Sequence, residues 1–139
     1  MFLRAATVLM SVSIGTASAQ VPPDIAARAA HRFPQPVRVE SLIGRDVLEP
    51  VEAQPVLGHV EAVTRRPDGG TDLILRLGGV LGVGGRPIAV PSEAVGLLGE
   101  YVAVLDYTPQ QLESFPTVSP TDVLPGSAIV RIGLTKPFH

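Results

Sequence analysis

The stretch GGVLGVGGRPIAVP, Gly78–Pro91, decides between two fold classes. A dinucleotide-binding loop has the pattern G-x-G-x-x-G between a strand and a helix, so that N–H groups at the helix start meet the phosphates. Gly82 and Gly84 fit the first two positions, but Pro87 occupies the third. No Gly-Lys-Ser/Thr sequence follows, as a P-loop would need, and Arg86–Val90 is typical of a strand. The stretch therefore predicts a bend between two strands rather than a phosphate-binding loop.

Alternating apolar and polar residues predict further strands on both sides of this bend. The alternating stretches are residues 37–43, Pro55–Arg66, Thr71–Leu77 and Tyr101–Asp106. Between two of them, Pro67-Asp68-Gly69-Gly70 predicts a tight turn, because proline presets φ and glycine accepts a positive φ. Short strands separated by Gly and Pro indicate a mainly β fold, and we expect a small closed antiparallel β-barrel. The side chains expected to fill it are Val56, Val60, Ala62, Leu73, Leu75 and Leu77.

One short C-terminal helix is predicted after the last of these strands. Thr108 is a suitable N-cap, Pro109 suits the first helical position and Gln111 completes a capping box. Pro116 ends the helix after about two turns. Leu112 should face the barrel, with Tyr107 and Phe115 packing the helix against it.

The N-terminus has the pattern of a secretory signal peptide. A single positive charge at Arg4 precedes the uncharged apolar run Ala5–Gly15, and Ala17-Ser18-Ala19 has small residues at both positions that signal peptidase reads. The run is about half the roughly 20 apolar residues that span a membrane. We therefore expect cleavage between Ala19 and Gln20, no transmembrane segment in the mature chain, and a periplasmic or secreted protein.

The chain then divides into four parts. Residues 1–19 are the signal peptide, and residues 20–40 form an N-terminal arm in which Asp24 is expected to cap a short helix. Residues 41–116 form the barrel-like domain. Residues 117–139 form a C-terminal extension with one candidate strand, Ser127–Leu134.

Composition excludes several classes of function. The 139 residues carry a formal net charge of −2 and contain no cysteine. Nucleic-acid binding is not expected, because it needs clustered Lys and Arg. Disulfides, thiol catalysis and thiolate metal sites are excluded.

Few residues stand out as candidates for a site. His59 and Glu61 lie two apart on one predicted strand, but a metal site needs three or four ligands, and the other histidines, His31 and His139, lie in the arms. A solvated strand face is the favoured interpretation, and no catalytic, cofactor-binding or metal residue is predicted. A hydrolase triad built on Ser92, Glu93 or Asp106 is not favoured, because no nucleophile elbow is present. The candidate partner surface consists of His59, Glu61, Arg65, Arg66 and Tyr107. Arg65 and Arg66 could bind an anionic partner, although a pair of arginines at a turn is expected chiefly to be solvated and to solubilise the turn.

An ordered set of short motifs over about residues 41–116 resembles the PRC-barrel family, named for the H subunit of the photosynthetic reaction centre. The motifs are Ile43-Gly44-Arg45-Asp46-Val47, Leu57-Gly58-His59-Val60, Asp68-Gly69-Gly70, the bend Gly78–Pro91, and the segment from Leu105-Asp106-Tyr107-Thr108 to Pro116. One departure is the segment Glu49–Pro55, which lacks the glycine usual in the family's first turn and is acidic.

The resemblance implies a small closed β-barrel that serves as a binding or adaptor module, with no catalytic motif to carry over. The favoured hypothesis is an exported, non-enzymatic module, without a cofactor, that binds a protein or cell-envelope partner. A small-molecule binder or enzyme that uses the barrel mouth near His59 and Glu61 is the alternative. A purely structural envelope protein is the third hypothesis.

Overall fold

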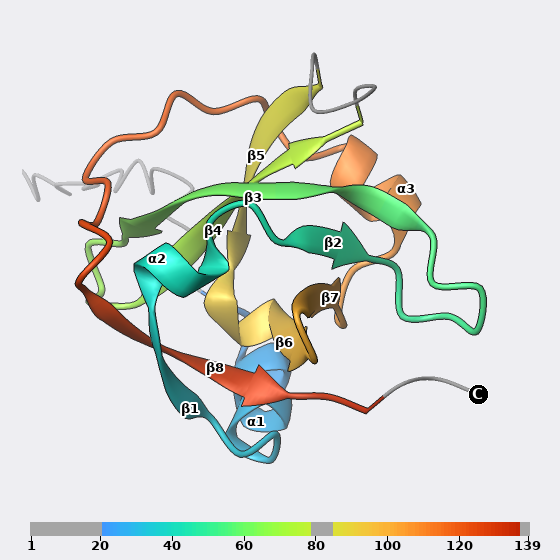
Figure 1. The fold of residues 1–139 in the computed structure, drawn as a ribbon, viewed down its shortest axis with the longest axis horizontal. Coiled ribbons are helices and arrows are strands. Elements are labelled where there is room, and N and C mark those ends of the chain that lie inside the picture. Colours follow the sequence, from blue (N-terminus) through green and yellow to red (C-terminus); the bar gives the residue numbers. More distant parts are fainter. Residues whose placement is uncertain (1–20, 79–84, 137–139) are drawn as a thin grey trace, which may run out of the picture.

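Eight strands form one sheet in the computed structural model, which describes residues 21–78 and 85–136 (Figure 1). Their order across the sheet is β1-β8-β6-β7-β2-β3-β4-β5. The strands are β1 (Gln35–Arg38), β2 (Asp46–Leu48), β3 (Val56–Arg65), β4 (Thr71–Leu77), β5 (Arg86–Pro91), β6 (Val95–Leu98), β7 (Tyr101–Val104) and β8 (Ile129–Leu134). The helices are α1 (Pro23–Ala30), α2 (Val39–Leu42), α3 (Pro109–Glu113) and the 3-10 turn η1 (Ser92–Ala94). The mainly β fold is confirmed, and within the described residues the outermost strands β1 and β5 do not pair with each other.

The pairing is mostly but not entirely antiparallel. The β3–β4 and β4–β5 pairs form an antiparallel meander of the longest strands. However, β2 pairs with β7, and β6 with β8, in parallel. The expectation of antiparallel pairing throughout is therefore wrong for these two pairs, both of which join strands far apart in the sequence.

A bulge in β3 changes which side chains reach the core. The β3–β4 register shifts between Val60 and Ala62, which leaves Glu61 as the extra residue. Val60 lies before the bulge and Val63 after it, and both are 0% exposed, because the extra residue changes the face of the residues that follow it. Val56 is 60% exposed, and a separate register shift in the β2–β3 pairing lies between it and Gly58. The prediction of strict alternation from Val56 through Ala62 is therefore wrong for this strand.

The residues of β4 are buried on both faces. Leu73 and Leu75 are 0% exposed and face the core, as predicted, while Ile74 on the opposite face is only 2% exposed. The chain after α3 covers that opposite face: Val118 N–H donates to the carbonyl of Pro87 on β5, and Val123 forms an isolated bridge with Thr64 on β3. The segment between these two anchor points crosses the outer side of the β3–β4–β5 meander.

The segment expected to be an N-terminal arm packs against the sheet. Ile25 of α1 is 4% exposed and belongs to the main core, and β1 pairs with β8 (Figure 1). Helix α1 begins after Pro22 with proline at its first position, so Asp24 lies in the first turn and is not the cap. The C-terminal strand predicted over Ser127–Leu134 is found as β8.

The strand predicted over residues 37–43 is wrong in its second half. Residues Val39–Leu42 form the single helical turn α2, with Val39 and Leu42 both buried. Spacing of three residues places these two side chains on one side of a helical turn, where both reach the core. The Ser41 hydroxyl also donates to the carbonyl of Arg38, which satisfies a carbonyl at the start of the turn.

The glycine-rich stretch is followed by a strand, as predicted. Residues 79–84 lie outside the described part of the chain, but Gly78 and Gly85 on either side have φ values of +75° and +89°. The next element is β5 rather than a helix. The arrangement therefore lacks the strand–loop–helix order that a dinucleotide fingerprint requires. Within residues 21–78 and 85–136, no helix has the length and apolar character needed to cross a membrane.

The capping box predicted for the C-terminal helix is confirmed in α3. Thr108 Oγ1 accepts a hydrogen bond of 3.1 Å from Gln111 N–H, and Gln111 Oε1 accepts one of 2.8 Å from Thr108 N–H. Leu112 is 1% exposed, and the rings of Tyr107 and Phe115 pack edge to face with centroids 4.9 Å apart.

We expect Leu112→Ala to destabilise the protein by about 2–5 kcal/mol, because it leaves a cavity in the core. Thr108→Ala should cost about 1 kcal/mol through loss of the cap. Glu113→Ala, at an exposed position of the same helix, is the control and should change stability by less than about 0.5 kcal/mol. Urea unfolding of the three variants measures the differences, and an effect at Leu112 no larger than that at Glu113 would show that α3 is not part of the fold.

Candidate functional site

The turn between β3 and β4 folds the side chain of Arg66 back into the protein. Arg66 N–H donates to the carbonyl of Gly70, and Gly69, with a φ of +88°, donates to the carbonyl of Arg66. A Cβ on Gly70 would lie 2.0 Å from Nη2 of Arg66. Only glycine leaves room there for the guanidinium, so the turn sequence and the placement of Arg66 depend on each other.

The buried guanidinium of Arg66 joins three carboxylates from different parts of the chain. It lies 2.8 Å from Oδ1 of Asp72 on β4, 3.0 Å from Oε1 of Glu93 on η1 and 3.2 Å from Oδ1 of Asp68 in the turn. Nη1 also donates to the carbonyl of Thr71 at 2.7 Å. The side chain of Arg66 is 6% exposed. This arrangement ties the β3–β4 turn to the segment that connects β5 with β6.

Charge partners and burial compete in this cluster. Burial favours the neutral form of Arg66, but hydrogen bonds to Glu93 and Asp72 outweigh it and raise the pKa of the guanidinium. Burial raises the pKa of Asp72, and the hydrogen bond from Arg66 offsets only part of this effect. The hydrogen bond from Gly70 N–H lowers the pKa of Asp68. The cluster holds more acidic groups than basic ones, which gives it negative character.

A second ion-pair cluster fixes α1 to the loop before α3. The carboxylate of Asp106, 3% exposed, accepts hydrogen bonds from Nη1 and Nη2 of Arg32 at 2.8 and 3.0 Å and from Nε of Arg28 at 2.8 Å. Burial disfavours the charge on Asp106, but the hydrogen bonds from Arg32 and Arg28 outweigh it and lower the pKa of this carboxyl. Arg32 Nη1 also donates to the carbonyl of Glu93 at 3.1 Å, which connects the two clusters.

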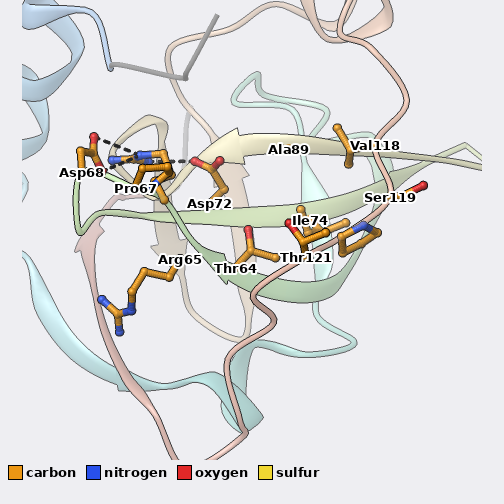
Figure 2. Close-up of a pocket in the computed structure, with 12 residues that line it drawn as sticks. Thr64, Arg65, Pro67, Asp68, Asp72, Ile74, Ala89, Val118, Ser119 and Thr121 are labelled. Atoms are coloured by element: carbon orange, nitrogen blue, oxygen red, sulfur yellow. Dashed lines mark hydrogen bonds and ion pairs between the residues drawn. The ribbon is translucent and has the colours of Figure 1, made fainter. Parts of the chain in front are cut away.

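A groove opens beside the Arg66 cluster, on the outer face of the meander (Figure 2). We call it the strap groove, because residues 118–121 pass over it. Its volume is about 460 Å³. The residues that line it are Thr64, Arg65, Arg66, Pro67, Asp68, Asp72, Ile74, Ala89, Val118, Ser119, Pro120 and Thr121. The charged side chains of Asp68 and Asp72 lie toward the β3–β4 turn, whereas Ile74 and Val118 lie further along the groove, together with Ser119 and Thr121 (Figure 2).

The structure separates the five residues of the predicted partner surface. Glu61 is the bulge residue and pairs with Arg76 at 2.9 Å. His59 lies half-buried opposite Arg76 in the β3–β4 register. Tyr107 packs against Phe115, and burial raises the pKa of its hydroxyl. These three residues do not line the strap groove.

Arg65 and Arg66, which the sequence suggested as a solvated pair, have different environments. Arg65 is exposed, donates to the carbonyl of Gly69 and lines the strap groove. Arg66 is buried in the cluster described above, so the expectation that it solubilises the turn is wrong. A hairpin brings residues that flank its turn together, so the spacing of Arg66 and Asp72 around Pro67–Gly70 was a signal that they would meet. Nothing local indicated that Glu93 or residues 118–121 would join them.

Among residues 21–78 and 85–136, no three His, Cys, Asp or Glu side chains are grouped so that they could hold a metal ion. Comparisons with models of known protein families, with curated proteins and with solved structures found no match.

We expect Asp106→Asn to destabilise the protein by about 1–3 kcal/mol at pH 7, because charged hydrogen bonds to two arginines are lost. The folded-state pKa of Asp106 is below its unfolded value, so this stabilisation is present above the unfolded pKa of about 3.9 and is lost as pH falls through the folded pKa. The difference between wild type and variant should thus shrink below about pH 4.

The measurement is urea unfolding of both proteins between pH 7 and pH 3. Asp24→Asn is the matched control, because Asp24 is 68% exposed and meets Arg28 only at 3.5 Å. Its effect should stay below about 0.5 kcal/mol. A loss for Asp106→Asn that does not depend on pH, or an equal loss at Asp24, would contradict the assignment.

Proposed function

We propose that this protein is an exported, non-enzymatic binding module built on a curled barrel of the PRC type, and that it recognises a protein or cell-envelope partner through its outer surface. The observation that carries the proposal is the contrast between a filled interior and a hollowed outer face. Inward-facing side chains of β2 to β7 join one buried cluster, with Val47, Val60, Leu75 and Val102 at 0% exposure. A ligand site needs open volume, which the strap groove supplies on the outside.

The roles of three glycines support the PRC-type interpretation. Gly44, in the first motif, has a φ of +84°, and Gly69, in the turn motif, has a φ of +88°. A Cβ on Gly58, in the second motif, would lie 2.0 Å from the carbonyl oxygen of Arg76 on β4. Each position therefore needs glycine for a backbone reason, as expected for motifs that shape a barrel.

Curling of the sheet supports the proposed barrel as well. Strands β4 and β5 lie at one end of the sheet order and β6 lies near the other, yet η1 connects β5 directly to β6. Buried side chains of β5 and β6, such as Val90 and Val95, belong to the same core cluster. The chain itself thus bridges the two ends of the curled sheet.

The alternative function, a small-molecule or catalytic site at the barrel mouth near His59 and Glu61, receives less support. The carboxylate of Glu61 is already paired with Arg76, and in the described part of the chain the two residues do not belong to any group of three side chains that could hold a metal ion.

To test the proposed function, the full chain is produced in its own cells with a photo-crosslinking amino acid at Thr121, on the rim of the strap groove. The control places the same amino acid at Glu100, an exposed residue in the turn between β6 and β7. We expect the processed protein to begin at Gln20 and a crosslinked adduct of defined mass to form only from position 121.

Two results would contradict the proposal. A mature protein that retains Met1 in the cytoplasm would remove the exported role. Identical adducts from both positions, or none from Thr121, would show that the outer face beside the groove is not a recognition surface.

A further inference from the structure

Two polar side chains stand side by side in the strap groove. Thr64 on β3 and Asp72 on β4 are register partners, so their side chains lie on the same face of the sheet, and both line the groove (Figure 2). Thr64 is 7% exposed, and its hydroxyl makes no side-chain hydrogen bond within the described residues. Because no fully enclosed side-chain polar atom there lacks a partner, this hydroxyl is open to solvent, and Thr64 lines the groove. The hydroxyl of a residue that is nine-tenths buried, beside a groove and without a protein partner, is available to a ligand.

Asp72 offers a second free group at the same place. Its Oδ1 accepts a 2.8 Å hydrogen bond from Arg66, whereas Oδ2 has no hydrogen-bond partner in the part of the chain that the structure describes. The residue is 7% exposed. One carboxylate oxygen and one hydroxyl are thus held in fixed positions by two neighbouring strands, and the ion pair with Arg66 limits the rotation of the carboxylate.

The groove continues from these polar groups onto apolar surface. Ile74 is two residues beyond Asp72 on the same face of β4, and Ala89 of β5 is its register partner. Val118 and Pro120, which belong to the segment that passes over the groove, also line this apolar end. A ligand whose polar end meets Thr64 and Asp72 would therefore place its remaining atoms against aliphatic side chains.

The charges around the groove favour a cation over an anion. The guanidinium of Arg66 is already shared among the carboxylates of Asp72, Glu93 and Asp68. Arg65 also lines the groove, but its side chain extends away from Asp72 (Figure 2). The three carboxylates outnumber the one arginine among them, so the free oxygen of Asp72 lies in a negative field.

We propose that the strap groove binds an ammonium group on a short apolar stem. The ammonium N–H groups donate to Oδ2 of Asp72 and Oγ1 of Thr64, and the stem packs on Ile74, Ala89 and Val118. A volume of about 460 Å³ lies within the range of small-ligand sites. The inference deepens the proposed function, since it names the chemistry that the outer face recognises, whether the ammonium belongs to a free amine or to a lysine side chain of a partner.

The test is a titration of the purified, ¹⁵N-labelled chain with benzylamine, benzyl alcohol and benzoate, followed by amide chemical shifts. These probes share the ring and differ in the charge of the polar end. We expect shifts in residues 64, 72, 74, 89 and 118–121, and an affinity for benzylamine at least about tenfold above that for benzyl alcohol, equivalent to 1.4 kcal/mol. Two further probes distinguish the source of the ammonium group. A lysine side chain of a partner predicts tighter binding of Nα-acetyl-lysine methylamide, and a free amine predicts tighter binding of n-butylamine.

Matched variants test whether benzylamine binding depends on the negative charge of Asp72. Asp72→Asn keeps an oxygen that can accept from Arg66 but removes the charge, and should weaken benzylamine binding about tenfold. Asp122→Asn, at an exposed acid directly after residues 118–121, should leave the affinity for benzylamine unchanged. Should Asp72→Asn fail to fold, Thr64→Val provides the second measure. Its control is Thr117→Val, at an exposed threonine that does not line the strap groove, and weaker binding is expected only at Thr64.

Three results would overturn the inference: tighter binding of benzoate than of benzylamine, no shift in the groove with any amine, or unchanged benzylamine affinity in a folded Asp72→Asn or Thr64→Val variant. Failure here is distinguishable from failure of the proposed function. A crosslinked adduct at Thr121 without amine binding would leave the module intact and refute only the ammonium chemistry.

Discussion

The buried guanidinium of Arg66 is the interaction on which the arrangement of the outer face depends. It is held by Asp72, Glu93 and Asp68, and these groups come from a strand, a 3-10 turn and a hairpin turn. A charge taken out of water is costly unless its partners are well placed, so these elements are constrained to one arrangement. Arginine suits this role because its planar guanidinium presents five donors in fixed directions.

Two consequences follow from this constraint. On one side of the cluster, Arg32 donates to the carbonyl of Glu93 while it pairs with Asp106, so the N-terminal helix is joined to the same network. On the other side, Asp72, whose Oδ1 accepts a hydrogen bond from Arg66, lines the strap groove. The network thus combines a structural role with the presentation of polar groups on the outer surface, where a binding module would need them.

Much of the fold could be predicted from local sequence signals. The capping box at Thr108 and the turn Pro67–Gly70 are encoded within four residues, and both are found. The β3 bulge at Glu61 could not be predicted, because the pattern around it is compatible with an unbroken strand. The packing of α1 was also missed, although this helix is amphipathic and its pattern around Ile25 was a signal for a buried face.

The candidate site was harder to predict, because its parts meet only in three dimensions. Thr64 and Asp72 are brought together by the register of one hairpin, which the turn Pro67–Gly70 between them fixes. Residues 118–121 reach the groove only because the chain after α3 returns across the sheet. His59, Glu61 and Tyr107 attracted attention because of their residue types, yet the structure places each of them outside the groove.

The most direct test of the Arg66 constraint compares Arg66→Lys with Arg65→Lys by urea unfolding at pH 7. Both changes keep the positive charge, so the comparison isolates the geometry of the buried guanidinium. Lysine cannot reproduce contacts with three carboxylates and a carbonyl, and we expect Arg66→Lys to destabilise the protein by about 2–4 kcal/mol. Arg65→Lys should change stability by less than about 0.5 kcal/mol. Equal and small effects at the two positions would contradict the view that Arg66 organises the outer face.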